Sequence, residues 1–128
     1  MAKTERVPDG PSPRGGGQTP LPICFIDAKG GAFAALAAGI ERARGHGEVI
    51  AATTSPVVGV PAEIGAVLAE IGVAVPEVVL AAGLPRHAER VDLASWPLAL
   101  HEGDGDLERL AVARIARDRI ERRLIAGV

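Results

Sequence analysis

Aromatic side chains are almost absent from this sequence. They make up 2% of its 128 residues, as Phe25, Phe33 and Trp96, and there is no tyrosine. Since hydrophobic residues still make up 48% of the chain, we expect a core built from alanine, valine, leucine and isoleucine. So few rings also argue against the aromatic platforms on which proteins stack the bases of single-stranded nucleic acids.

Cysteine is nearly absent as well, and Cys24 is the only one. A single cysteine forms no intramolecular disulfide and cannot build a thiolate cage around a metal. The histidines, His46, His87 and His101, show no spacing typical of metal ligands. We therefore predict a protein without a metal site and without a cofactor.

The sequence also lacks a basic excess and a long uninterrupted apolar run. Its net charge is -2 and its pI about 5.9, whereas nucleic-acid-binding domains usually carry a clear positive excess. The apolar stretch 21–40 contains Asp27, Lys29 and several glycines, which makes it a poor membrane span. Residues 1–20 contain no apolar segment of an export signal. We predict a cytoplasmic protein that binds neither nucleic acid nor membranes.

The chain divides into a tail and a single domain. Residues 1–20 are rich in proline and glycine, a composition typical of disorder. Residues 21–128 are enough for one α/β domain with its own core. We therefore expect one folded unit preceded by a disordered tail.

Apolar runs and helical periodicity alternate along the domain. Short runs predict strands near 21–26, 48–53, 77–82 and 90–93. Apolar residues at helical spacing predict helices starting after Gly31, at Val60-Pro61 and at Asp106. The last helix is expected to run to Ile125 and to bury one face made of Leu107, Leu110, Ala111, Ile115 and Leu124, with Ile120 at its margin. Alternation of strands and helices predicts a doubly wound, three-layer α/β sandwich, in which helices cover both faces of a parallel sheet.

Three stretches of the sequence, 23–38, 53–73 and 96–124, resemble the low-molecular-weight protein tyrosine phosphatase superfamily, which includes thioredoxin-coupled arsenate reductases. The middle stretch is the most specific, with Thr53-Thr54-Ser55-Pro56 followed by Val60-Pro61-Ala62-Glu63. The resemblance implies a low-molecular-weight phosphatase-like fold with a sheet of four parallel strands, in agreement with the alternation of strands and helices.

The chemistry of that superfamily depends on a C-x5-R loop between the first strand and the first helix. The cysteine thiolate attacks the substrate, and backbone N–H groups at the helix start hold the oxyanion. The arginine clamps two oxygens, and an aspartate from a later loop protonates the leaving group. This resemblance therefore implies an enzyme only if those three side chains are present.

All three side chains are missing at the positions that match the pattern. Asp27 stands where the cysteine is expected, Phe33 where the arginine is expected, and Leu100 at the position of the later acid. Cys24 does not replace the nucleophile, because the residue that would have to be its arginine is Gly30. The resemblance thus implies a degenerate site with no catalytic residue.

Three functions remain open at this point. We predict a catalytically inactive, phosphatase-like binding or regulatory domain whose partner is an unidentified protein or a second copy of itself. The alternative is an active low-molecular-weight protein tyrosine phosphatase or arsenate reductase-type enzyme, whose turnover would depend on Asp27. A further alternative is an anion sensor that binds its ligand weakly through Lys29, Gly30, Gly31 and Ala32 at the helix start.

Overall fold

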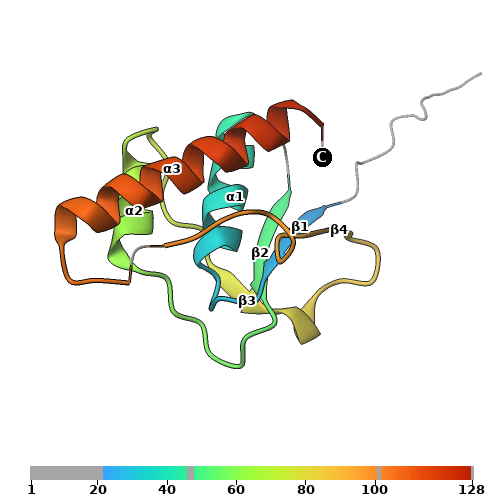
Figure 1. Cartoon of the computed structure of the whole chain (residues 1–128). Helices are drawn as coiled ribbons and strands as arrows, with labels where there is room; N and C mark the ends of the chain where they lie inside the picture. The colour runs from blue at the N-terminus through green and yellow to red at the C-terminus, as the bar shows by residue number, and fades with distance from the viewer. Residues whose placement is uncertain (1–21, 46–47, 101, 128) are drawn as a thin grey trace, which may run out of the picture.

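The computed structural model describes residues 22–45, 48–100 and 102–127 (Figure 1). The predicted strands and helices are all found there, with small shifts at their ends, while the predicted tail, 1–20, lies outside the described residues. In chain order the elements are β1 (Ile23–Asp27), α1 (Ala32–Ala43), β2 (Val49–Thr53), α2 (Ala62–Ala69), β3 (Val78–Leu80), the short 3-10 helix η3 (Ala81–Gly83), β4 (Glu89–Asp92) and α3 (Asp106–Ile125).

The strands form one parallel sheet in the order β3-β2-β1-β4. The register pairs Asp27, the last residue of β1, with Thr53, the last residue of β2. The predicted α/β class and the predicted four-stranded parallel sheet are therefore confirmed. Because parallel strands end at the same edge of the sheet, the segments that follow β1, β2 and β4 meet there.

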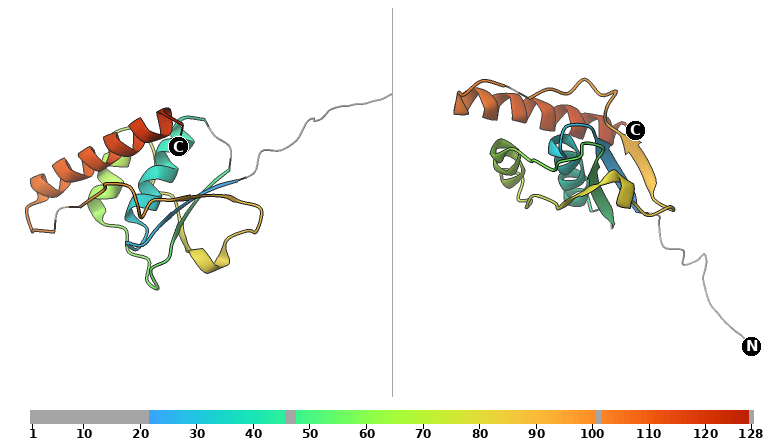
Figure 2. Two further views of the ribbon diagram at one scale, coloured as in Figure 1. Left: turned by 45° about the vertical axis from the view of Figure 1, so that its right-hand side comes forward. Right: turned by 90° about the horizontal axis from the view of Figure 1, so that it is seen from below.

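The three helices of the described residues pack together. α1 packs on β1 and β2, and both α2 and α3 pack on α1 and on each other, so all three helices lie on one side of the sheet (Figures 1 and 2). The strand order explains this arrangement. The connections β1–α1–β2 and β2–α2–β3 run in the same direction across the sheet, and two right-handed crossovers in one direction place their helices on one face. Between β3 and β4 the described residues contain only the short η3.

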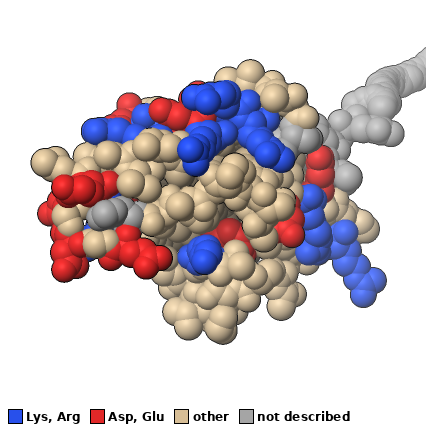
Figure 3. Space-filling view, in the orientation of Figure 1, with Lys and Arg blue, Asp and Glu red and all other residues tan. Residues whose placement is uncertain are grey.

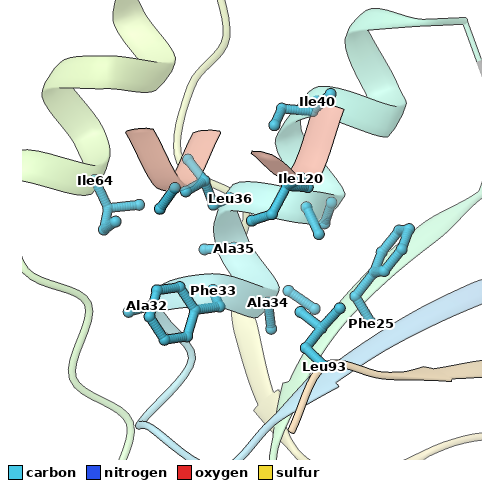
Figure 4. Close-up of a cluster of buried hydrophobic side chains, with 14 of the residues drawn as sticks. Phe25, Ala32, Phe33, Ala34, Ala35, Leu36, Ile40, Ile64, Leu93 and Ile120 are labelled. Carbon is cyan, nitrogen blue, oxygen red and sulfur yellow. The ribbon is translucent and has the colours of Figure 1, made fainter. Parts of the chain in front are cut away.

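Helix α1 is buried on every side over 32–41, because the sheet covers it from one side and α3 from the other (Figure 4). The small side chains of Ala34, Ala35, Ala37 and Ala38 allow the neighbouring elements to approach closely. The core is aliphatic, as predicted, and Phe25, Phe33 and Trp96 are its aromatic members.

The buried face of helix α3 coincides with the predicted one only in part: Leu124 is buried and Leu110 half-buried, as expected, and Ile120, expected at the margin, is fully buried. Its buried side chains are Ala113, Ala116, Ile120 and Leu124, whereas Leu107 and Ile115, both expected in the core, are exposed. The larger apolar side chains dominated the sequence prediction, but a helix that lies against the alanine-rich α1 is better accommodated by small contact residues. The first turn of α3 extends beyond α1, so Leu107 has no core to enter (Figure 1). Among the described residues, no helix is both long and apolar enough to cross a membrane.

Candidate functional site

The candidate site lies where β1 turns into α1. Asp27 ends β1 and is only 2% exposed, and two glycines, Gly30 and Gly31, lead from it into the helix. Both glycines have positive φ angles, 76° and 101°. A Cβ atom on Gly31 would lie 2.5 Å from Cγ1 of Val78, so this turn accepts only glycine at that position. The glycines thus let the backbone fold tightly around the end of β1.

The carboxylate of Asp27 points into this turn and accepts hydrogen bonds from four backbone N–H groups. Its Oδ1 accepts from Lys29 at 3.0 Å and from Gly31 at 2.9 Å. Its Oδ2 accepts from Phe33 and Ala34, both at 2.9 Å. The last two donors belong to the first turn of α1, where N–H groups have no partner within the helix. One side chain therefore occupies donors in both the turn and the helix start.

Chemically, this arrangement is an anion cradle that holds a carboxylate of its own chain. Backbone N–H groups that converge at a helix start favour a negative charge, because their dipoles point at it. The carboxylate of Asp27 supplies that charge. It lies at the position where the resemblance places a thiolate and its oxyanion substrate.

Strand β2 fixes the other side of Asp27. The backbone carbonyl of Asp27 accepts hydrogen bonds from the Thr54 N–H at 2.8 Å and from the hydroxyls of Thr53 and Thr54 at 3.2 and 3.3 Å. Thr53 is fully buried. These contacts hold the end of β1, and with it the carboxylate, in a single position. The stretch around Thr53 that carried the resemblance thus supports the turn.

A cavity of about 140 Å³ opens beside the turn. Its lining residues come from the turn, from α1 and from the segment after β4, and they are Asp27, Ala28, Lys29, Phe33, Leu93, Ala94, Trp96 and Leu98. The only charged side chains among them are those of Asp27 and Lys29, and Lys29 is exposed. Phe33, with its aromatic ring, stands where an anion-binding loop of the resembled type carries arginine.

The other predicted site residues lie in different surroundings. Leu100 is half-buried against the core and does not line the cavity, whereas Leu98, two positions earlier, does. Of the predicted anion-binding residues, Lys29 and Gly31 donate their N–H groups to Asp27. The carbonyl of Gly30 accepts from the Gly59 N–H at 2.9 Å, and Ala32 is part of the core.

Cys24 lies within β1 and is fully buried. Burial raises the pKa of its thiol, and the positive charge of Arg90 offsets this only in part. No cluster of histidine, cysteine, aspartate and glutamate suited to a metal occurs among the residues that the structure describes.

A capping contact is the usual role of an aspartate at this position, but the convergence of four N–H groups on Asp27 was not predicted, although a signal was present. An aspartate that ends a strand and is followed within a few residues by two glycines and a helix start is close to several free N–H groups. The turn and the loop around Trp96 are expected from the fold analogy to share one end of the sheet, and the structure confirms this: β4 lies beside β1, and Trp96 and Leu98 line the cavity.

Comparison with known proteins supports the fold. No protein-family model matches the sequence, and none of the curated proteins matches it. A solved structure described as "An arsenate reductase in the phosphate binding state" is similar, with a TM-score of 0.65 and 15% sequence identity over 83% of this chain and 95% of that chain. At this identity the likeness concerns the fold, which is that of a low-molecular-weight phosphatase-like domain.

Proposed function

We propose that this domain is a catalytically inactive relative of the low-molecular-weight phosphatases and arsenate reductases, and that it acts by binding another protein or a second copy of itself. The hydrogen bonds of Asp27 carry the proposal: each of its two carboxylate oxygens accepts hydrogen bonds from two backbone N–H groups. The donors that an enzyme of this fold would offer to a phosphate or arsenate are occupied by the protein itself.

The same geometry argues against Asp27 as a nucleophile. A carboxylate whose two oxygens each accept two hydrogen bonds has little free electron density to attack a substrate. An approaching oxyanion would be repelled by the charge of Asp27, and no guanidinium lines the cavity to compensate, because Phe33 takes that place. Cys24, fully buried and with a raised thiol pKa, supplies no alternative.

A partner would most naturally meet the end of the sheet where the turn and the segment after β4 lie together. Segments that follow parallel strands are the usual binding surface of such sheets. Here that surface comprises 27–33 and the residues from Trp96 to Leu98. We therefore propose that the binding surface coincides with the positions at which an enzyme of this fold would carry its catalytic residues.

The test is hydrolysis of p-nitrophenyl phosphate by the purified protein, beside Asp27→Ala and beside the double variant Asp27→Cys, Phe33→Arg. Asp92→Ala is the matched control, because Asp92 also caps a backbone N–H (that of Ala94, at 2.9 Å) but is exposed. We expect no turnover by the native chain, and activity only in the double variant. Turnover by the native chain that is lost in Asp27→Ala and kept in Asp92→Ala would contradict the proposal and favour an active enzyme.

A further inference from the structure

A second, larger pocket of about 330 Å³ lies between α3 and the segment after β4. Trp96, Pro97 and Leu98 provide its apolar floor, and its other lining residues are the arginines Arg119, Arg122 and Arg123. The three arginines are spaced at i, i+3 and i+4 along α3, which places them on one face of the helix. The pocket thus combines an apolar base with a positively charged wall.

Contacts with the floor hold two of these arginines in position. The guanidinium of Arg123 lies over the ring of Trp96, 4.7 Å from its centroid. Arg119 donates from Nη1 to the carbonyl of Pro97 at 3.0 Å. Both side chains are therefore partly preorganised at the pocket, which reduces the entropy lost when a ligand binds.

The positive charge of this wall is not neutralised within the described part of the chain, where no ion pair joins Arg119, Arg122 or Arg123 to a carboxylate. Other arginines of α3 do have such partners: Arg109 pairs with Asp104 and Asp106, and both Arg114 and Arg117 pair with Glu70. Figure 3 shows the outcome as a basic patch over the carboxyl-terminal half of α3, with acidic side chains gathered at the opposite end. These three guanidinium groups, which have no carboxylate partner among the described residues, are available to an external anion.

We propose that this pocket binds a short acidic segment of a partner protein, with one apolar side chain on Pro97 and Leu98, beside Trp96, and flanking carboxylates on Arg119, Arg122 and Arg123. Guanidinium groups bind carboxylates with two parallel hydrogen bonds, and the floor offers apolar area for an anchor. A long polyanion such as nucleic acid is disfavoured, because Asp118 and Glu121 lie on the same helix and the net charge is negative.

This inference rests on the proposed function only in that both assign the domain a protein partner. The pocket adjoins the cavity beside Asp27, since both are lined by Trp96 and Leu98. The proposed binding of an acidic segment involves neither the carboxylate of Asp27 nor the backbone N–H groups of the turn. Binding at the arginines can therefore succeed or fail independently of turnover at Asp27.

Trp96 makes the test direct, because it is the only tryptophan of the chain and there is no tyrosine. The probe is the synthetic peptide acetyl-EELED-amide, titrated into the full-length protein while tryptophan fluorescence is recorded. The neutral peptide acetyl-QQLQN-amide is the matched control ligand. We expect a saturable change with the acidic peptide, weakened by added salt, and none with the neutral one.

The double variant Arg119→Gln, Arg122→Gln should weaken binding of the acidic peptide about tenfold or more, because two charge-assisted contacts are lost. Arg109→Gln, on the same helix but outside the pocket, should bind as the native chain does. Asp27→Ala, provided that its melting curve shows a folded protein, should also keep the binding. Absence of binding, equal binding of the two peptides, tighter binding of an oligothymidylate, or unchanged binding by the double variant would overturn the inference.

Discussion

The backbone N–H of Phe33 donates a 2.9 Å hydrogen bond to Oδ2 of Asp27, and these are the two positions at which the resemblance expects arginine and cysteine. In an anion-binding loop both positions contact the bound oxyanion. In this chain Asp27 supplies an internal anion, and the side chain of Phe33 lines the neighbouring cavity in place of a cation. The two differences from the superfamily pattern are consistent with each other, because a site whose N–H groups already bind Asp27 does not require an arginine to bind an external oxyanion.

Gly31→Ala should destabilise the protein by about 3 kcal/mol, from left-handed backbone strain together with a steric clash. The φ angle of Gly31 is 101°, and the added Cβ would meet the side chain of Val78 at 2.5 Å. The matched control is Gly72→Ala, because Gly72 has a φ of 77° but no atom within 4 Å of an added Cβ. Gly72→Ala should cost only the strain, about 1 kcal/mol. Urea unfolding measures the free energy of unfolding of both variants. An equal decrease in the two would show that the clash with Val78 does not affect stability.

Glu70 should make stability depend on pH in acid. Hydrogen bonds from Arg114 and Arg117 hold the pKa of Glu70 at about 2, against an ordinary value of 4.5. Because the folded pKa is the lower one, the stabilisation is complete above about pH 4.5 and is lost as the pH falls towards 2.

Glu70→Gln should therefore lower the melting temperature at neutral pH, and the difference from the native chain should shrink below pH 4.5. Glu121→Gln serves as the control, since no ion pair of Glu121 occurs among the described residues. A Glu70→Gln difference that stays constant from neutral pH to pH 3 would show that the ion pairs do not couple α2 to α3.

Cys24 should react very slowly with Ellman's reagent in the native state. The reagent needs an accessible thiolate, whereas Cys24 is fully buried and its thiol pKa is raised by burial. We expect labelling at least about 100-fold slower than in the guanidinium-unfolded chain, because the reaction requires an opening of the sheet. Rapid labelling of the folded protein would mean that β1 is more accessible than its packing indicates.

Much of this architecture could be predicted from the sequence, because strands and helices alternate with clear periodicity. The segments around Ile23, Val49 and Ile64 formed the expected elements. The position of the helices on a single face could not be predicted in this way, since it depends on the order in which the strands pair. The buried face of α3 was predicted only in part for a related reason: Leu107 and Ile115 are exposed, because the alanine-rich α1 packs against Ala113 and Ala116 instead.

The candidate site was located from the sequence, but its internal contact was not. The resemblance aligns Asp27 and Phe33 with the ends of the loop between the first strand and the first helix, and the structure places Asp27 at the end of β1 and Phe33 in the first turn of α1. The convergence of four N–H groups on one carboxylate depends on the φ angles of Gly30 and Gly31, and no residue pattern states these directly. The arginine pocket was missed because α3 and Trp96 are brought together only by tertiary packing.

Removal of the internal anion should destabilise the protein substantially. Asp27→Ala leaves four N–H groups without their acceptor and should destabilise the protein by about 3 kcal/mol, whereas Asp92→Ala, which frees one exposed N–H, should cost less than about 1 kcal/mol. Urea unfolding of both variants measures this difference. A similar, small decrease in the free energy of unfolding of the two variants would mean that the hydrogen bonds of Asp27 contribute little to stability.

If Asp27 takes the place of a bound oxyanion, removal of its carboxylate opens the cradle to phosphate, and the melting temperature in phosphate detects this binding. Phosphate at high concentration, compared with sodium chloride at equal ionic strength, should raise the melting temperature of Asp27→Ala, because the vacated N–H groups can bind it in the folded state only. The rise should be clearly smaller in the native chain and in Asp92→Ala, in which the carboxylate of Asp27 still occupies the cradle and phosphate can bind only elsewhere, at the arginines of α3. Stabilisation of the native chain by phosphate to the same extent as Asp27→Ala would contradict the account, because the cradle would then be open to external anions while Asp27 is present.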